Sequence, residues 1–200
     1  DALQDALRQL VSPLSVGSRA LVAQNRLDAG DVATHDPHAG RILKLARRPD
    51  EFRAFFAYHD ALMLRENGLS KGEKEMIVVA TSGANACLYC VVAHGAILRI
   101  YEKNPLLADQ LATNWRKAPL TPRQQAMIVF AMKVATASGD LEERDFDCLR
   151  AEGFSDEDAW DIGAIAAFFA LSNRMANLSG MMPNPEFYLM GRIPREKKAG

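Results

Sequence analysis

The feature that most constrains the fold is an internal repeat between residues 69–80 and 120–131. The first segment reads LSKGEKEMIVVA and the second reads LTPRQQAMIVFA. Both carry a Ser or Thr followed three residues later by Glu or Gln, the capping box that begins a helix, and both continue with Met-Ile-Val. The repeat therefore predicts a duplicated helical hairpin, in which each copy buries its apolar stripe against the other.

Helical periodicity runs through most of the remaining chain, and no window alternates strongly enough to predict a strand. Asn85 is predicted to be the N-cap of a helix that starts near Ala86. The fold class is therefore predicted to be all-α, a helical bundle. The expected helices cover residues 49–67, 70–82, 86–102, 121–137, 141–151 and 155–178.

The N-terminal residues differ from the rest. Residues 3–25 have helix-compatible periodicity, and residues 25–40 are rich in Gly, Asp, His and Pro, as loops are. We therefore expect residues 1–40 to be a helical extension and loop, and residues 41–200 to be the main helical domain.

Composition excludes several classes of function. The 24 basic and 25 acidic side chains almost cancel, and without a basic stripe we expect no nucleic-acid partner. The longest apolar stretches, such as residues 162–171, are shorter than the ~20 residues that a bilayer requires, so we expect no membrane partner. The first residues lack the order of charge and apolar run of a signal peptide, which favours a cytoplasmic protein.

Cysteine usage points to chemistry rather than to stapling. The chain has three cysteines, and two of them form the motif Cys87-x-x-Cys90. A secreted disulfide scaffold needs more cysteines and an even number, whereas a close pair in a cytoplasmic protein indicates redox chemistry or a metal.

Cys87, Cys90 and His94 fall on one face of the expected helix, because residues three and four apart are neighbours there. Near the helix start, the unpaired amides lower the pKa of Cys87. Glu75 lies in the preceding helix, and antiparallel packing places it near the start of the cysteine helix, partly desolvated. Two thiols with an imidazole and a carboxylate are suited to thiol chemistry with proton transfer.

The second copy of the repeat lacks these four residues. Carried along without gaps, the alignment pairs them with other types: Glu75 with Ala126, Cys87 with Ser138, Cys90 with Leu141 and His94 with Asp145. A helix of this kind therefore does not need them in order to fold.

Other interpretations remain open. The four residues are also a donor set for zinc, although structural zinc sites usually draw on two separated ligand pairs, and the cysteines can be buried structural residues. Cys148, between apolar residues, is expected to be a small buried side chain. His59 is expected to be a half-buried core residue. Asn173 and Arg174 interrupt an apolar helix, and we expect them at a subunit contact or near the site.

The spacing of Glu75, eleven residues, Cys87-x-x-Cys90, three residues and His94 matches the alkylhydroperoxidase D signature. The flanking run EMIVVATSGANACLYCVVAHGAIL and the later NRMANLSGMMPNPEFY are also similar. Over residues 40–190 the chain resembles the peroxidase-related branch of the alkylhydroperoxidase D and carboxymuconolactone decarboxylase superfamily.

The resemblance implies that Cys90 is the peroxidatic cysteine, that Cys87 resolves it as a disulfide, and that Glu75 and His94 form a proton relay. It also implies a homo-oligomer, as a dimer, trimer or hexamer. Tyr89 stands between the cysteines, where family members often carry His. A phenol can hydrogen-bond, but it titrates too high to shuttle protons as His does.

The expected function is a thiol-dependent peroxidase for hydrogen peroxide or organic hydroperoxides. It needs no bound cofactor but does need an external dithiol reductant, such as a lipoyl domain or a thioredoxin-like protein. Carboxymuconolactone decarboxylases proper lack the cysteine pair, which argues against lactone decarboxylation. The alternative is a redox-sensing or zinc-binding helical scaffold without peroxidase turnover.

Overall fold

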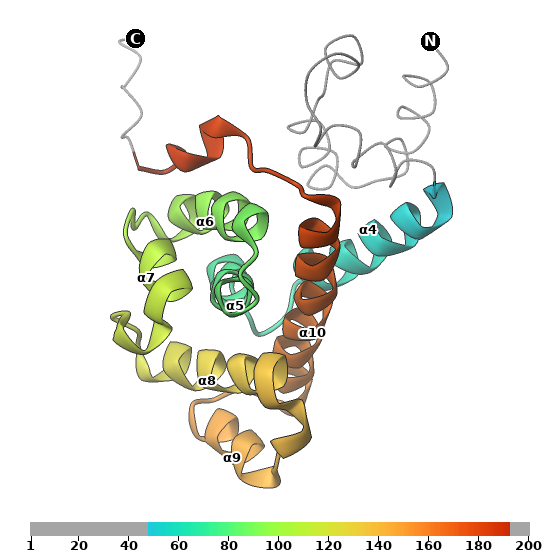
Figure 1. Ribbon diagram of the computed structural model, residues 1–200. Helices are drawn as coiled ribbons and strands as arrows, with labels where there is room; N and C mark the ends of the chain where they lie inside the picture. The colour runs from blue at the N-terminus through green and yellow to red at the C-terminus, as the bar shows by residue number, and fades with distance from the viewer. Residues whose placement is uncertain (1–47, 193–200) are drawn as a thin grey trace, which may run out of the picture. The chain divides into compact units, whose positions relative to one another are not determined.

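The computed structural model describes residues 48–192, and in these residues every regular element is helical, which confirms the all-α fold class (Figure 1). None of the helices described is long and apolar enough to cross a membrane. The α-helices are α4 (Pro49–Met63), α5 (Lys71–Ala84), α6 (Leu88–Glu102), α7 (Leu107–Asn114), α8 (Pro122–Ala137), α9 (Glu143–Ala151) and α10 (Asp156–Ser179). The short 3₁₀ helices are η1 (Trp115–Lys117), η2 (Ser138–Asp140) and η3 (Pro185–Tyr188).

The chain divides into two compact units. One contains α4 and residues Asn177–Met182, and the other contains Asn67–Ala176 and the segment that begins at Pro183. The predicted boundary at residue 40, and the extension that it delimits, lie outside the described residues.

Within the first unit, α4 begins at Pro49, whose missing amide is not needed in a first helical turn. His59 is half-buried as predicted: its ring packs on Phe56 at 6.1 Å between centroids, and its Nδ1 lies 3.0 Å from Asp60 Oδ1.

The second unit is built around α5. This helix contacts α6, α7 and α8, and Figure 1 shows it nearly end-on between them. Every residue from Gly72 to Ser82 is buried. A side chain at Gly83 would bring its Cβ within 2.4 Å of the Ala112 carbonyl oxygen, so glycine here allows α5 and the backbone of α7 to approach closely. Residues on α5 are therefore shielded from water along most of the helix.

Both predicted capping boxes are present. Ser70 Oγ accepts from the Glu73 amide at 3.0 Å, and Glu73 Oε2 accepts from the Ser70 amide at 2.8 Å. Thr121 Oγ1 and Gln124 Oε1 make the same exchange at 3.2 and 3.0 Å. Because α5 and α8 begin in the same way, the duplicated helix that the sequence predicts is confirmed.

The start of α6 differs from the prediction. Asn85 is not its N-cap: Asn85 ends α5, and the N-cap of α6 is Cys87. Between them Ala86 adopts a left-handed conformation with φ of 50°, which allows the Cys87 amide to donate to the Ser82 carbonyl at 3.0 Å. The Asn85 side chain instead donates to Asn173 on α10, at 3.0 Å.

The prediction that Cys148 is buried is wrong. Cys148 is exposed, and the buried residue of α9 is its neighbour Leu149. Adjacent residues of a helix point about 100° apart, so when Leu149 faces the interior, Cys148 before it faces the solvent. Phe146 still packs on Phe130 of α8, with 5.1 Å between the ring centroids.

Candidate active site

The two cysteines of the motif meet at the start of α6. Cys87 is the N-cap, and its sulfur accepts from the Cys90 amide at 3.4 Å. The two residues approach to 2.8 Å, both are free cysteines, and only 1% of Cys87 and 2% of Cys90 is exposed. The helix start therefore places two thiols within reach of disulfide formation, away from bulk water.

The surroundings of the two sulfurs push their pKa values apart. A hydrogen bond from the Cys90 thiol is the largest effect on Cys87, and it lowers the Cys87 pKa to about 7 against the opposing effect of burial. The Cys90 amide and the Asn173 side chain act in the same direction. The pKa of Cys90 is raised, first because its proton is held in the bond to Cys87 and then because of burial. Cys87 is therefore the more acidic thiol of the pair, and Cys90 is the one that keeps its proton.

Glu75 of α5 and His94 of α6 form a buried pair. Glu75 Oε2 lies 2.7 Å from His94 Nδ1, and 7% of each side chain is exposed. The predicted meeting of Glu75 with the cysteine helix is thereby confirmed. With an ionised carboxylate, which only accepts hydrogen bonds, Nδ1 is the donor of this contact. Nε2 is then the ring nitrogen that can exchange a proton with other groups.

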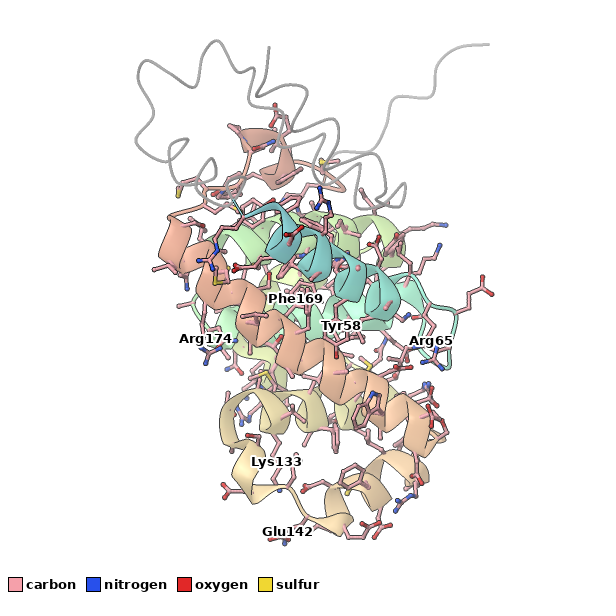
Figure 2. The ribbon with its side chains drawn as sticks, turned by 90° about the vertical axis from the view of Figure 1, so that its right-hand side faces the viewer. Tyr58, Arg65, Lys133, Glu142, Phe169 and Arg174 are labelled. Carbon is pink, nitrogen blue, oxygen red and sulfur yellow. The ribbon has the colours of Figure 1, made fainter. Side chains whose placement is uncertain are left out.

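A residue of α10 covers the imidazole. Phe169 meets the His94 ring edge-to-face, with 4.8 Å between centroids and 84° between planes. Figure 2 labels Phe169 on this helix. The contact fixes the plane of the imidazole and leaves less room for water beside it.

α10 also contributes a residue that the motif does not contain. Asn173 is fully buried and donates through Nδ2 to Ser82 Oγ at 2.9 Å. Hydrogen bonding by its amide lowers the pKa values of Cys87 and Cys90, and Ser172 acts on the pKa of Cys90 in the same direction. Of the two places expected for Asn173, a subunit contact or the neighbourhood of the site, the structure shows it near the site. The signal for it in the sequence is a single amide within an otherwise apolar stretch.

Two tyrosines on α6 differ in their relation to these groups. Tyr89, between the cysteines, is buried. Tyr101 is about half exposed, and its pKa is raised by partial burial and then by the negative charge of Glu75. Sequence reasoning missed Tyr101, although it lies seven residues, nearly two turns, beyond His94 on the same helix.

The geometry gives no support to the metal interpretation. Within residues 48–192, no three His, Cys, Asp or Glu side chains converge in an arrangement that could hold a metal ion. Glu75 and His94 are hydrogen-bonded to each other, and Cys87 and Cys90 are free thiols.

Comparison with known proteins adds sequence and fold similarity. Residues 49–105 match the model of the carboxymuconolactone decarboxylase family. A peroxidase-related protein from Ralstonia eutropha, described as an alkylhydroperoxidase AhpD core, is 63% identical over 92% of this chain and 94% of its own, with a TM-score of 0.76. A peroxidase-related protein from a Silicibacter species is 45% identical over 72% of this chain and 75% of its own, with a TM-score of 0.70.

More distant similarity is limited to the fold. The debrominase Bmp8 is 22% identical over 76% of this chain and 81% of its own, with a TM-score of 0.64. None of the curated proteins compared with the chain matches it.

Proposed function

Because the chain belongs to the peroxidase-related branch of the alkylhydroperoxidase D and carboxymuconolactone decarboxylase family, we propose that it is a thiol-dependent peroxidase acting on hydrogen peroxide or organic hydroperoxides. The observation that carries the proposal is the buried pair of free cysteines, on the same helix as an imidazole hydrogen-bonded to Glu75. These groups supply a nucleophile, a resolving thiol and a proton donor for the leaving group.

In the first step Cys90 attacks the peroxide. Its proton passes to Nε2 of His94, the sulfur forms a bond to the hydroxyl oxygen, and the O–O bond breaks. The leaving alkoxide, or hydroxide, takes the proton from Nε2, so the products are a Cys90 sulfenic acid and an alcohol or water. A thiolate of higher pKa is intrinsically the better nucleophile, and the raised pKa of Cys90 suits this role once its proton has moved.

In the second step Cys87 resolves the sulfenic acid. Its pKa of about 7 makes a large fraction of Cys87 thiolate at neutral pH. It attacks the Cys90 sulfur, the S–O bond breaks, and the departing hydroxide takes a proton delivered from solvent through His94. The products are a Cys87–Cys90 disulfide and water.

An external dithiol closes the cycle by thiol–disulfide exchange. A lipoyl group or a thioredoxin-like protein has the required chemistry, and the reaction needs no bound cofactor. A cytoplasmic location fits this proposal, since dithiol reductants are kept reduced there.

Tyr89 has a supporting role in this proposal. Its phenol titrates too high to relay protons near neutrality, but it can bond to a substrate oxygen. Tyr89→Phe is expected to lower peroxide consumption less than tenfold, whereas replacement of His94 removes the proton donor itself. Parallel steady-state assays of Tyr89→Phe and His94→Gln separate the two roles.

A homo-oligomer, as a dimer, trimer or hexamer, remains part of the proposal. Trp160 and Leu171, on α10, expose 72% and 52% of their surface, as residues at a subunit contact would in a single chain. Light scattering on the eluted protein measures the number of subunits directly.

The central test is peroxide oxidation of single cysteine variants with mass analysis. Cys90→Ser is expected to abolish peroxide consumption. Cys87→Ser is expected to form a Cys90 sulfenic acid that accumulates and over-oxidises. The control is Cys148→Ser, since Cys148 is exposed on α9 and should leave the rate unchanged. Consumption that survives in Cys90→Ser but not in Cys87→Ser would reverse the two roles.

The scaffold alternative predicts different results. A zinc-binding protein would carry stoichiometric zinc in elemental analysis, and a redox sensor would oxidise once without turnover. Repeated turnover with a lipoyl domain or thioredoxin, by metal-free protein, would exclude both.

A further inference from the structure

Asn173 lies in the least hydrated part of the molecule. It is fully buried on α10, and the cost of burying an amide is offset only when its hydrogen-bonding groups find partners. Two partners come from the end of α5: Oδ1 accepts from Asn85 Nδ2 at 3.0 Å, and Nδ2 donates to Ser82 Oγ at 2.9 Å.

These two bonds leave one Nδ2 hydrogen, because a primary amide has two. Hydrogen bonding by the Asn173 side chain lowers the pKa values of both Cys87 and Cys90. The second Nδ2 hydrogen is the group available to act on the cysteine pair. An apolar residue of similar size could fill the same space, but it would offer no donor to a buried thiolate.

Ser82 links this amide to the backbone of the pair. Its carbonyl accepts from the Cys87 amide at 3.0 Å, while its hydroxyl accepts from Asn173. The side chain that donates to the sulfurs is thus fixed by the same turn that positions Cys87. The direction of the donor is consequently set by the fold rather than by the free rotation of a side chain.

We propose that Asn173 is a positioning residue of the thiol pair, which orients the two sulfurs and stabilises the thiolate form by donating to it from α10. The proposal rests on the proposed redox function of the pair, but it concerns the resting dithiol and can be measured without peroxide.

Several charged or titratable groups surround the same sulfurs. Cys90 and His94 come from α6 and act on Cys87 directly, and Glu75 comes from α5 through its bond to His94. The neighbours from α10, Asn173 and Ser172, are uncharged. A change at Asn173 therefore leaves the ionisable groups in place and alters only the donor.

The test is the pH dependence of thiolate absorbance in the ultraviolet, measured on the reduced protein in a Cys148→Ser background. The parent is expected to titrate at about pH 7, the pKa of Cys87. Asn173→Leu keeps the approximate size and removes the donor without adding a charge, so its midpoint should rise by about one pH unit, a tenfold loss of thiolate near neutrality. Asn173→Ser should shift in the same direction by less. Asn114→Leu, at an exposed asparagine on α7, is the matched control and should not shift.

A second readout separates tuning from structure. Both Asn173 variants should also lower the equilibrium constant for reduction of the disulfide, by up to about tenfold and in proportion to the shift in midpoint, because each destabilises the reduced pair. A purely structural role would lower the melting temperature and leave the midpoint in place. An unchanged midpoint in a folded Asn173→Leu protein would overturn the proposal. If neither variant folds, Ser82→Ala, which removes the acceptor that orients the amide, should raise the midpoint by a fraction of a unit, and no shift there would overturn it equally. Retention of this effect in a protein without peroxidase turnover would refute the proposed function alone.

Discussion

The two helical hairpins of the larger unit begin alike and then diverge. α5 and α8 share a capping box and the Met-Ile-Val core, yet α5 is buried from Gly72 to Ser82, whereas α8 buries only four residues. Glu75 on α5 corresponds to Ala126 on α8, so the carboxylate occurs only on the helix that is shielded from water.

The second helices differ in the same sense. If the N-caps Cys87 and Glu142 are aligned, Asp145 takes the place of Cys90 and Leu149 that of His94. Asp145 bonds to the Glu142 amide at 2.8 Å and to Lys133 at 2.6 Å, both near the surface, and Figure 2 labels Lys133 and Glu142 at the α8–α9 end. The first hairpin buries its polar side chains, with Glu75 bonded to His94. The second leaves its ion pair partly exposed, where Asp145 caps α9 and pairs with Lys133.

The largest effect is expected when the first hairpin is given the residues that the second hairpin carries at the same positions. The double variant Glu75→Ala, His94→Leu removes both members of a buried pair, and peroxide consumption should fall about 100-fold or more because the proton donor is lost. Unfolding in urea should show a double variant more stable than His94→Leu alone, which leaves a buried carboxylate without its partner and costs about 1–3 kcal/mol.

A variant of the second hairpin provides the control for this experiment. Asp145→Asn in the second hairpin alters a partly buried ion pair with Lys133 and should leave peroxide consumption unchanged. Equal loss of activity in Asp145→Asn and in the double variant would mean that the two hairpins are not functionally distinct.

A smaller effect concerns pH. Below its pKa of about 7, Cys87 becomes protonated, so disulfide formation in a single turnover should be about tenfold slower one pH unit below that value than on the plateau above it. The hydrogen bond from Lys133 lowers the pKa of Asp145, which therefore stays charged over this interval. Rapid acid quench with mass analysis gives the rate. A flat profile through neutral pH would mean that the thiolate of Cys87 does not limit resolution.

Local sequence signals predicted the helices well because caps act within one turn. Ser70 and Thr121 each bond to a residue three positions on, so their helices start where the sequence places them. The motif likewise gave Glu75 and His94 as neighbours, because antiparallel helices joined by a tight turn bring those positions together.

Features that depend on partners far along the chain could not be predicted from local sequence. Asn85 has the right chemistry for an N-cap, but its side chain is taken by Asn173, far along the chain. The ungapped alignment of the repeat fails after α8 because η2 delays the start of α9. His94 therefore corresponds to Leu149 rather than to Asp145, a shift that only the positions of the helix starts reveal.

The capping boxes allow the finest comparison, since they are the part that the hairpins share. Ser70→Ala and Thr121→Ala should each cost about 1 kcal/mol of unfolding free energy, because each leaves one helical amide without its acceptor. The boxes differ at the third helical residue: Glu73 also accepts from Arg123 Nε at 3.1 Å, whereas Gln124 makes no charged pair. Glu73→Ala should therefore cost more than Gln124→Ala, by about 0.5–1 kcal/mol for a partly buried ion pair. Urea unfolding of the four variants measures this difference, and it should shrink in an Arg123→Ala background. If the difference persists without Arg123, the stronger cap of the first hairpin comes from its burial and not from the ion pair.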